Sequence, residues 1–448
     1  MSTLPTQAAD AIPHPLVVRT VAIDDPGTLL ALLPADAPLA WVRRGDGLVG
    51  WGEVLRFEVA GPGRFADAER AWHDALTHAV VRDEVHLPGS GPVAFGSFAF
   101  DEGSPAGGVV IVPRVVVGRR GATTWLTTID LGARIGATPS LDAVARDRTP
   151  VAAPGAVTFG DGAVSAQGWR DVVARGVAAI RAGELDKVVL ARDVVATTTH
   201  PLDPRWVLRR LGADYPSCWT FSVDGLLGAT PELLVRSEKG LVTSRVLAGT
   251  IRRTGNDDAD LARAAILAHS SKDLEEHEYA VSSVADALAP FCSSTNVPDV
   301  PFVLHLPNVL HLASDVTGVL SAAHPGPSAV HLGPAAATAS LAPSSLALAA
   351  ALHPTAAVCG TPTTVARDLI ARIEGMERGR YAGPVGWFGA DGDGEWGIAL
   401  RCAEMDPADP RRVRLFAGCG IVAASNPDAE LAESEAKLVP MRHALSAD

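Results

Sequence analysis

The stretch at residues 218–246, CWTFSVDGLLGATPELLVRSEKGLVTSRV, decides how the rest of the chain is interpreted. Its apolar runs at 218–223, 226–229, 233–237 and 241–246 are too short for helices, and turns separate them. Short apolar runs bounded by Gly, Pro or Asp are typical of β-strands. Because strands joined by such brief turns pair in antiparallel order, the stretch predicts an antiparallel sheet.

Outward from this stretch, strands and helices are interleaved. Residues 1–160 alternate β-like runs with turns rich in Gly and Pro. Hydrophobic spacing predicts helices at 169–182, 364–377 and 427–444, and one long helix or two abutting helices at 258–289. It predicts further strands at 187–197, 382–390, 395–403 and 412–424. The chain lacks the regular βαβ spacing and the GxGxxG turn of a dinucleotide-binding fold. We predict an α+β fold dominated by antiparallel sheet, with a surface insertion at 321–345.

The composition is that of a globular protein. Of its 448 residues, 47% are hydrophobic and 20% charged, which allows a large core and excludes a disordered chain. The 38 basic and 51 acidic side chains give a net charge of −13, without the basic block that nucleic-acid binding requires. No secretory signal or clean membrane-spanning stretch is visible, and the five cysteines follow no zinc or disulfide pattern. We therefore expect a cytoplasmic enzyme with reduced thiols and no nucleic-acid or membrane partner.

Two predicted helices carry carboxylates three residues apart. Asp273 and Glu276 share one helix face, as do Glu430 and Glu433, with Lys437 four residues further along the second face. Either pair alone is most simply a solvated surface. If both pairs met in one cleft, however, they would repel unless a hard cation joined them, and oxygen-only ligands suit Mg²⁺.

Three charged residues stand in apolar surroundings. Lys187, in GELDKVVLAR, is either an exposed strand end or a desolvated lysine able to act as a general base. Glu232 follows a Thr-Pro turn and is either a turn cap or a buried carboxyl that donates a proton. Arg401 interrupts an apolar strand, where an arginine usually has a bound anion or an internal partner.

Eight ordered blocks of sequence resemble the chorismate-utilising enzymes, the family of anthranilate, aminodeoxychorismate, isochorismate and salicylate synthases. The blocks are GELDKVVLAR, GATPELLV, VLAGTIRR, SSKDLEEHE, ALHPTAAVCGTP, GRYAGPVGW, IALRCAE and AGCGIVAASNPDAELAESEAKL. The resemblance covers the catalytic region at residues 165–445, whereas the N-terminal β-rich part at 1–160 matches loosely. It implies one integrated α+β domain, in which two packed antiparallel sheets are flanked by helices.

Within this family the chain looks most like an isochorismate synthase, which converts chorismate to isochorismate. The amine-using members typically carry VDLxRND after the metal-binding EH, whereas this chain reads AVSSVADAL at 280–288. The intact block at 352–355 and Phe416 favour an isochorismate synthase over a salicylate synthase, which adds pyruvate elimination and is the nearest alternative. An anthranilate or aminodeoxychorismate synthase component comes next. The product would feed menaquinone, siderophore or salicylate biosynthesis.

The resemblance also implies a role for each candidate residue. Lys187 would activate water for attack at C2, and Glu232 would protonate the leaving 4-hydroxyl. The implied Mg²⁺ ligands are Glu276 and Glu433 directly, with Asp273 and Glu430 acting through water. The implied substrate-binding residues are Gly249, Ala351, Tyr381, Arg401, Gly418 and Lys437, with Ala351 in the pocket wall, Arg401 and Tyr381 at the enolpyruvyl carboxylate and Lys437 at the ring carboxylate. We expect a monomer that needs no glutaminase subunit.

Overall fold

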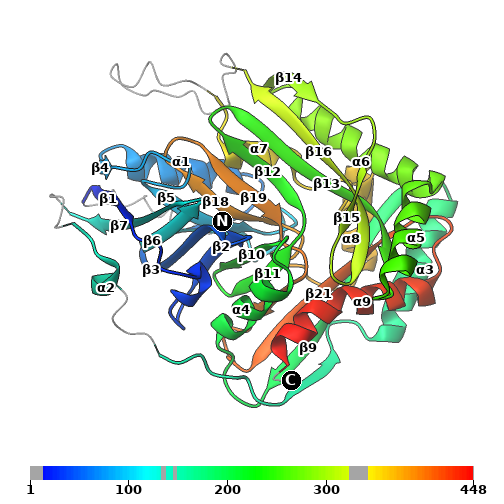
Figure 1. Ribbon diagram of the computed structural model, residues 1–448. Helices are drawn as coiled ribbons and strands as arrows, with labels where there is room; N and C mark the ends of the chain where they lie inside the picture. Colours follow the sequence, from blue (N-terminus) through cyan, green and yellow to red (C-terminus); the bar gives the residue numbers. More distant parts are fainter. Residues whose placement is uncertain (1–13, 133–137, 145–148, 322–341, 447–448) are drawn as a thin grey trace, which may run out of the picture.

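Antiparallel pairing accounts for most of the described chain. The computed structural model describes residues 14–132, 138–144, 149–321 and 342–446 (Figure 1). The strands are β1 (Leu16–Ile23), β2 (Leu39–Arg43), β3 (Asp46–Val59), β4 (Val80–Asp83), β5 (Val93–Phe98), β6 (Gly108–Arg120), β7 (Thr123–Leu131), β8 (Val157–Asp161), β9 (Lys187–Thr198), β10 (Trp219–Val223), β11 (Leu226–Thr230), β12 (Leu233–Glu238), β13 (Leu241–Arg252), β14 (Cys292–Asn296), β15 (Phe302–His305), β16 (Val309–Leu320), β17 (Gly360–Thr361), β18 (Pro384–Gly389), β19 (Gly394–Ile398), β20 (Cys402–Met405) and β21 (Arg412–Ile421).

Helices separate these strands along the chain. They are α1 (Arg64–Leu76), α2 (Leu141–Val144), α3 (Ala166–Arg181), α4 (Pro204–Asp214), α5 (Asp257–Ala268), α6 (Ser271–Leu288), α7 (Ser345–Leu352), α8 (Thr363–Ile373) and α9 (Pro427–Leu445), with a 3₁₀ turn at Leu29–Ala31. The predicted α+β class is confirmed. The predicted strands between residues 218 and 246 correspond to β10, β11, β12 and the first half of β13. Most of the predicted insertion at 321–345 lies outside the described residues.

The strands form one continuous sheet with two long arms. From β6, one arm runs through β3, β2, β10, β11, β20 and β21 to β9, and the other runs through β5, β18, β19, β12 and β13 to β16. Among the described pairs, β1 with β4 is parallel and the others are antiparallel. The active-site elements β9 and β13 therefore lie near opposite ends of the same sheet.

The two arms fold over one another as two packed antiparallel layers, and β6 joins these layers into one continuous sheet. Strand β6 pairs with β3 along its length, with β5 at its first residues and with β7 at its last residues. The β3–β6 register shifts between Glu53 and Leu55, opposite Pro113, whose missing N–H suits an irregular position. Trp41 of one arm donates to Glu395 of the other at 2.9 Å, across the buried layer between the arms.

Helices pack along the two ends of the sheet. Figure 1 shows α5 and α6 beside β13 and β16, and α3 and α9 beside β9 and β21. Of the two alternatives for 258–289, the structure has two abutting helices, and Ser270 caps α6 by accepting a hydrogen bond from the Asp273 N–H at 3.3 Å. Asn426 caps α9 in the same way. No described helix combines the length and apolarity needed to cross a membrane.

Candidate active site

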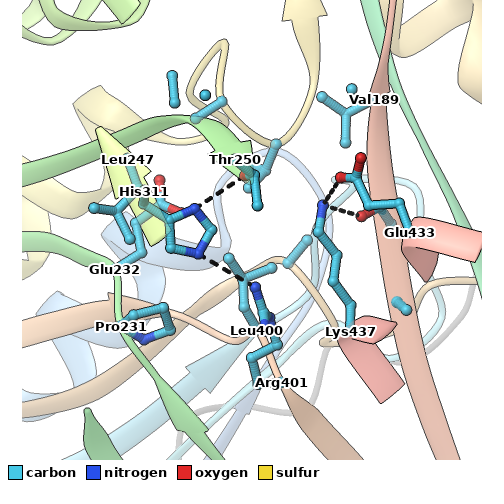
Figure 2. Close-up of a pocket in the computed structure, with 18 of the residues that line it drawn as sticks. Val189, Pro231, Glu232, Leu247, Thr250, His311, Leu400, Arg401, Glu433 and Lys437 are labelled. Carbon is cyan, nitrogen blue, oxygen red and sulfur yellow. Dashed lines mark hydrogen bonds and ion pairs between the residues drawn. The ribbon is translucent and has the colours of Figure 1, made fainter. Parts of the chain in front are cut away.

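A cavity of about 210 Å³ lies between the two ends of the folded sheet. Strands β9 and β21 contribute one wall, β13 and β16 the opposite wall, and the first turn of α6 and the first two turns of α9 supply carboxylates. Figure 2 shows His311 with its partners on one side and the pair of Lys437 and Glu433 on the other. Folding the arms together thus brings residues more than 200 positions apart into one site.

Most of the residues predicted for the site line this cavity. They are Lys187, Glu232, Gly249, Asp273, Tyr381, Arg401, Gly418, Glu430, Glu433 and Lys437. Glu276 belongs to α6, and its side chain lies outside the described residues. The prediction for Ala351 is wrong: α7 buries the side that carries Leu348, Ala349 and Leu352, so Ala351 is exposed and does not line the cavity. The nearby wall is formed by Ala357 and Val358 instead.

Glu232 occupies the connection between β11 and β12 and is 6% exposed. Burial raises the pKa of its carboxyl to about 8, although the positive charges of Lys187, Arg401 and Lys437 act to lower it. Glu232 is therefore mostly protonated at neutral pH and can donate a proton into the cavity. Lys187 is the half-buried first residue of β9, as the sequence predicted, and is near enough to influence that pKa.

Lys437 and Glu433 form an ion pair on one face of α9. The Lys437 ammonium donates to Glu433 Oε1 at 2.7 Å and to the Gly418 carbonyl at 2.9 Å. Burial acts to raise the pKa of Glu433, but Lys437 and Arg401 outweigh it and hold that pKa below its ordinary value. Because an ammonium has three N–H donors, these two contacts leave a third for an anionic ligand.

Arg401 lies in the link between β19 and β20, not inside a strand as the sequence predicted. Its φ is +49°, and the Leu400 N–H donates back to the Ile398 carbonyl at 2.7 Å, so the chain bends sharply here. The bend directs the guanidinium into the cavity. Burial lowers the Arg401 pKa, but a guanidinium remains charged in proteins. The cavity thus holds a half-buried cation suited to a carboxylate.

His311 is a site residue that the sequence analysis missed. It lies on β16, with its Nε2 accepting from Arg401 at 3.5 Å and its Nδ1 next to Thr250 Oγ1 at 3.0 Å. Burial, followed by the charges of Arg401 and Lys437, lowers the pKa of His311 to about 3. The imidazole is therefore neutral at pH 7, and the Arg401 contact places its hydrogen on Nδ1, toward Thr250.

Two glycines allow close approach at the cavity wall. Gly249 has a φ of +79° at a register shift in the β13–β16 pair, and a Cβ there would lie 3.1 Å from Asp273 Cβ. A Cβ on Gly418 would lie 3.0 Å from the Tyr381 hydroxyl. Tyr381 is held by stacking on Phe416, with ring centroids 5.0 Å apart. Side chains at either glycine would displace residues of the site.

Arg378 is a second residue that the sequence analysis missed. Its guanidinium pairs with buried Glu374 at 2.6 Å and donates to the carbonyls of Val189 at 2.8 Å and Val358 at 3.2 Å. Glu374 also accepts from the Ala191 N–H at 2.8 Å. This buried pair joins α8 to β9 and to the Val358 wall, and so fixes the strand that begins at Lys187.

The carboxylates of the cavity fit a hard cation. Oxygen atoms of Glu430 and Glu433 lie within 4.8 Å of each other and of Cys419 Sγ. Burial raises the pKa of the Cys419 thiol, which donates to the Glu430 carbonyl at 3.4 Å and is therefore no thiolate ligand. Asp273 reaches the same cavity from α6, where it is hydrogen-bonded to Ser270. A set of carboxylate oxygens without thiolate suits Mg²⁺.

Comparisons with known proteins show the family to which the chain belongs. The family model described as "Chorismate binding enzyme" matches residues 39–446. The chain is 40% identical over 291 residues to isochorismate synthase DhbC of Bacillus subtilis (strain 168), covering 62% of this chain and 68% of that protein. It is 33% identical, over 98% of its length and 92% of the other protein, to the salicylate biosynthesis isochorismate synthase of Pseudomonas aeruginosa. The structure of MenF, the menaquinone-specific isochorismate synthase from Escherichia coli, has the same fold, with a TM-score of 0.77, 24% identity and coverage of 98% and 97%.

Proposed function

Because the chain belongs to the chorismate-binding enzyme family, we propose that it is a Mg²⁺-dependent isochorismate synthase. One observation carries the proposal: Glu232, protonated at neutral pH, shares a cavity with Lys187 and with cations suited to a diacid. The isomerisation adds water at C2 of chorismate while the 4-hydroxyl leaves. It therefore needs a base for the water and an acid for the leaving group.

The two carboxylates of chorismate have separate partners in this proposal. Arg401, with Tyr381 beside it, would bind the enolpyruvyl carboxylate, and the third N–H of Lys437 would bind the ring carboxylate. Support comes from the placement of both cations in the same cavity and from the neutral His311, which leaves the Arg401 charge uncompensated. Two fixed contacts would orient the ring between Lys187 and Glu232.

Lys187 and Glu232 would then act together. Lys187 removes a proton from water as the water oxygen bonds to C2, and the C4–O bond breaks. Glu232 gives its proton to the departing oxygen, which leaves as a second water. The reverse reaction uses the same two groups in exchanged roles, so we expect a reversible enzyme.

The carboxylate set would hold Mg²⁺ through Glu276 and Glu433, with Asp273 and Glu430 acting through water. When bound there, Mg²⁺ neutralises the ring carboxylate and withdraws charge from the conjugated ring. The Lys437 contact keeps Glu433 ionised, which prepares it as a ligand. Without the cation, four carboxylates and a dianionic substrate would repel each other.

The proposal is tested with purified protein, chorismate and MgCl₂, using chromatography to identify the products. We expect isochorismate without added glutaminase or lyase, loss of turnover in EDTA, and recovery when Mg²⁺ is restored. Full turnover in metal-free buffer would contradict the Mg²⁺ assignment. Salicylate as the dominant early product would replace the proposal with a salicylate synthase, and an aminated product with ammonia would replace it with an amine-using synthase.

A further inference from the structure

A second cavity of about 320 Å³ adjoins the substrate cavity at the start of β9. Lys187 and Val422 line both cavities, so they form the boundary between them. The second cavity is open to solvent and is otherwise lined by residues of α6, β17 and the segment before β17, among them Glu275, Ala356 and Thr361. We call it the side chamber. Neither the fold nor the substrate contacts described above require it.

The reaction requires a water beside Lys187, which gives the side chamber a role that rests on the proposed function. Once chorismate is held by both carboxylates, its ring occupies the space between Lys187 and Glu232. The attacking water must still lie against Lys187 on the face opposite the leaving hydroxyl. A route that reaches Lys187 from the side chamber would supply this water without requiring the substrate to leave.

The charges of the side chamber favour water over the substrate. Its described lining contains two carboxylates, Asp186 and Glu275, and one cation, Lys187. The carboxylates disfavour entry of a dianion such as chorismate, whereas a neutral water meets no such barrier. Small residues line the wall at Ala280 and Ala356. The chamber is therefore suited to water and to small neutral or cationic molecules.

The wall beside Lys187 is held by the backbone. Thr361 of β17 is the register partner of Lys187, and its carbonyl accepts from the Asp186 N–H at 2.9 Å. The Thr361 side chain lines the chamber and is half-buried. A larger side chain at this position would reduce the chamber without removing the backbone contact that places Lys187.

We propose that the side chamber is the route by which the attacking water reaches Lys187 while chorismate occupies the substrate cavity. Water enters from the chamber, its oxygen bonds to C2, and its proton passes to Lys187. The 4-hydroxyl leaves with the proton of Glu232, so one water enters and one is released in each turnover. Lys187 thus contacts the substrate on one side and its water supply on the other.

The test replaces Lys187 with a diffusible base. Lys187→Ala is assayed for isochorismate formation at saturating chorismate and Mg²⁺, with added methylamine or ethylamine. With the amine present, we expect kcat of Lys187→Ala to rise at least about tenfold above its value without the amine. Because the amine would enter through the side chamber, raising the chorismate concentration should not suppress the rescue. Rescue that falls as chorismate rises would overturn the proposal, because the amine would then use the substrate cavity.

A second substitution blocks the route. Thr361→Leu in the Lys187→Ala background should abolish rescue, and Thr361→Leu alone should lower kcat with little change in KM. Ala356→Val, which narrows the chamber elsewhere, should weaken rescue in the same direction. Thr364→Leu is the matched control, because Thr364 is exposed on α8 and lies outside the chamber lining. Undiminished rescue in folded Thr361→Leu would overturn the water route, whereas failure of the unmodified enzyme to make isochorismate would instead overturn the proposed function.

Discussion

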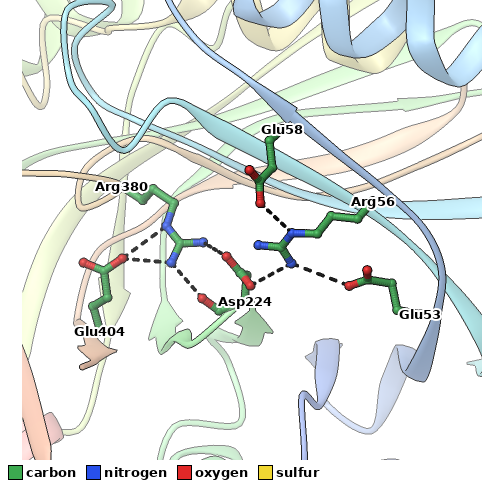
Figure 3. A network of polar contacts seen from close by, with 6 residues as sticks. All are labelled: Glu53, Arg56, Glu58, Asp224, Arg380 and Glu404. Carbon is green, nitrogen blue, oxygen red and sulfur yellow. Dashed lines mark hydrogen bonds and ion pairs between the residues drawn. The ribbon is translucent and has the colours of Figure 1, made fainter. Parts of the chain in front are cut away.

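Near the β10–β11 turn, Arg56 and Arg380 alternate with carboxylates, whereas in the active-site cavity Arg401 lies against a neutral histidine. Figure 3 shows the first cluster: Arg380 pairs with Glu404 at 2.8 Å and with Asp224 at 3.2 Å, and Asp224 also pairs with Arg56 at 3.0 Å. The hydrogen bond that Arg56 donates to Asp224 is the largest of the effects that raise the Arg56 pKa. In this network the charges satisfy one another.

In the cavity the charges are arranged for a ligand. Arg401 has its pKa lowered by burial, and Glu232 has its pKa raised by burial, so neither group is stabilised in its ionised form by the folded protein alone. The comparison shows a difference in pairing: Arg56 and Arg380 each have carboxylate partners, whereas in the cavity Lys437 is paired with Glu433 but Arg401 contacts the neutral His311. The same substitution should therefore have opposite consequences in the two regions.

The largest effect is expected for Glu232→Gln. The amide keeps the shape of the side chain but cannot protonate the leaving hydroxyl, so kcat should fall by about 10²–10⁴-fold. The unmodified enzyme should lose kcat as pH rises through about 8, because Glu232 then ionises. Steady-state kinetics over pH 6 to 10 checks both. Glu53→Gln, the same change in the network, should leave the profile unaltered.

Glu232 should also make stability depend on pH. Its folded-state pKa is raised from 4.5 to about 8, so the folded protein binds the proton more tightly than the unfolded chain. The stabilisation is complete below pH 4.5 and is lost as pH rises toward 8. Glu232→Gln should therefore become progressively more stable than the unmodified protein across that range, as urea unfolding at several pH values would reveal. If the difference in unfolding free energy between Glu232→Gln and the unmodified protein did not change with pH, burial would not be raising the Glu232 pKa.

The next effect is expected for Arg401→Gln. Charged hydrogen bonds contribute about 1.5–3 kcal/mol, so losing the contact to a substrate carboxylate should lower kcat/KM by about 10- to 100-fold. The stability of the fold should be unchanged or higher, because a half-buried cation has been removed. Steady-state kinetics checks the loss of kcat/KM, and thermal unfolding of the same preparation checks the stability. A strong loss of stability would show that Arg401 serves the fold instead.

The smallest effect is expected for Arg56→Gln, the matched substitution in the network. Partly exposed ion pairs contribute about 0.2–1 kcal/mol, so this variant should be slightly less stable. Its kcat and KM should equal those of the unmodified enzyme. If Arg56→Gln impaired turnover as much as Arg401→Gln, the distinction between the two charged regions would fail.

The sequence predicted those features that depend on local pattern. The short strands of β10 to β13 and the carboxylates of α6 and α9 follow from hydrophobic runs and helical spacing. The resemblance also placed Lys187, Glu232 and Arg401 in one site, and the structure brings them together. Local pattern could not show that the arms continue through β6, because that depends on pairing between residues far apart.

The missed residues have a related cause. His311 sits in the apolar run LHLAS, where a core histidine and a site histidine look alike until its neighbours are known. Helices α1 and α4 were also missed, the first within a region dominated by strands. Ala351 was misplaced because the resemblance assigned it from a block of sequence, which does not show which side of α7 faces the cavity. Each of these features is determined by tertiary contacts.

The central claim, that Lys187 and Glu232 are the base and acid of an isochorismate synthase, is tested most directly by the turnover of Lys187→Ala. The variant should remain folded by circular dichroism, retain KM for chorismate, and lose about 10²–10⁴-fold in kcat for isochorismate formation. This result would show that Lys187 acts in the chemical step and not in folding or substrate binding. A folded Lys187→Ala enzyme that makes isochorismate at the native kcat would contradict the account.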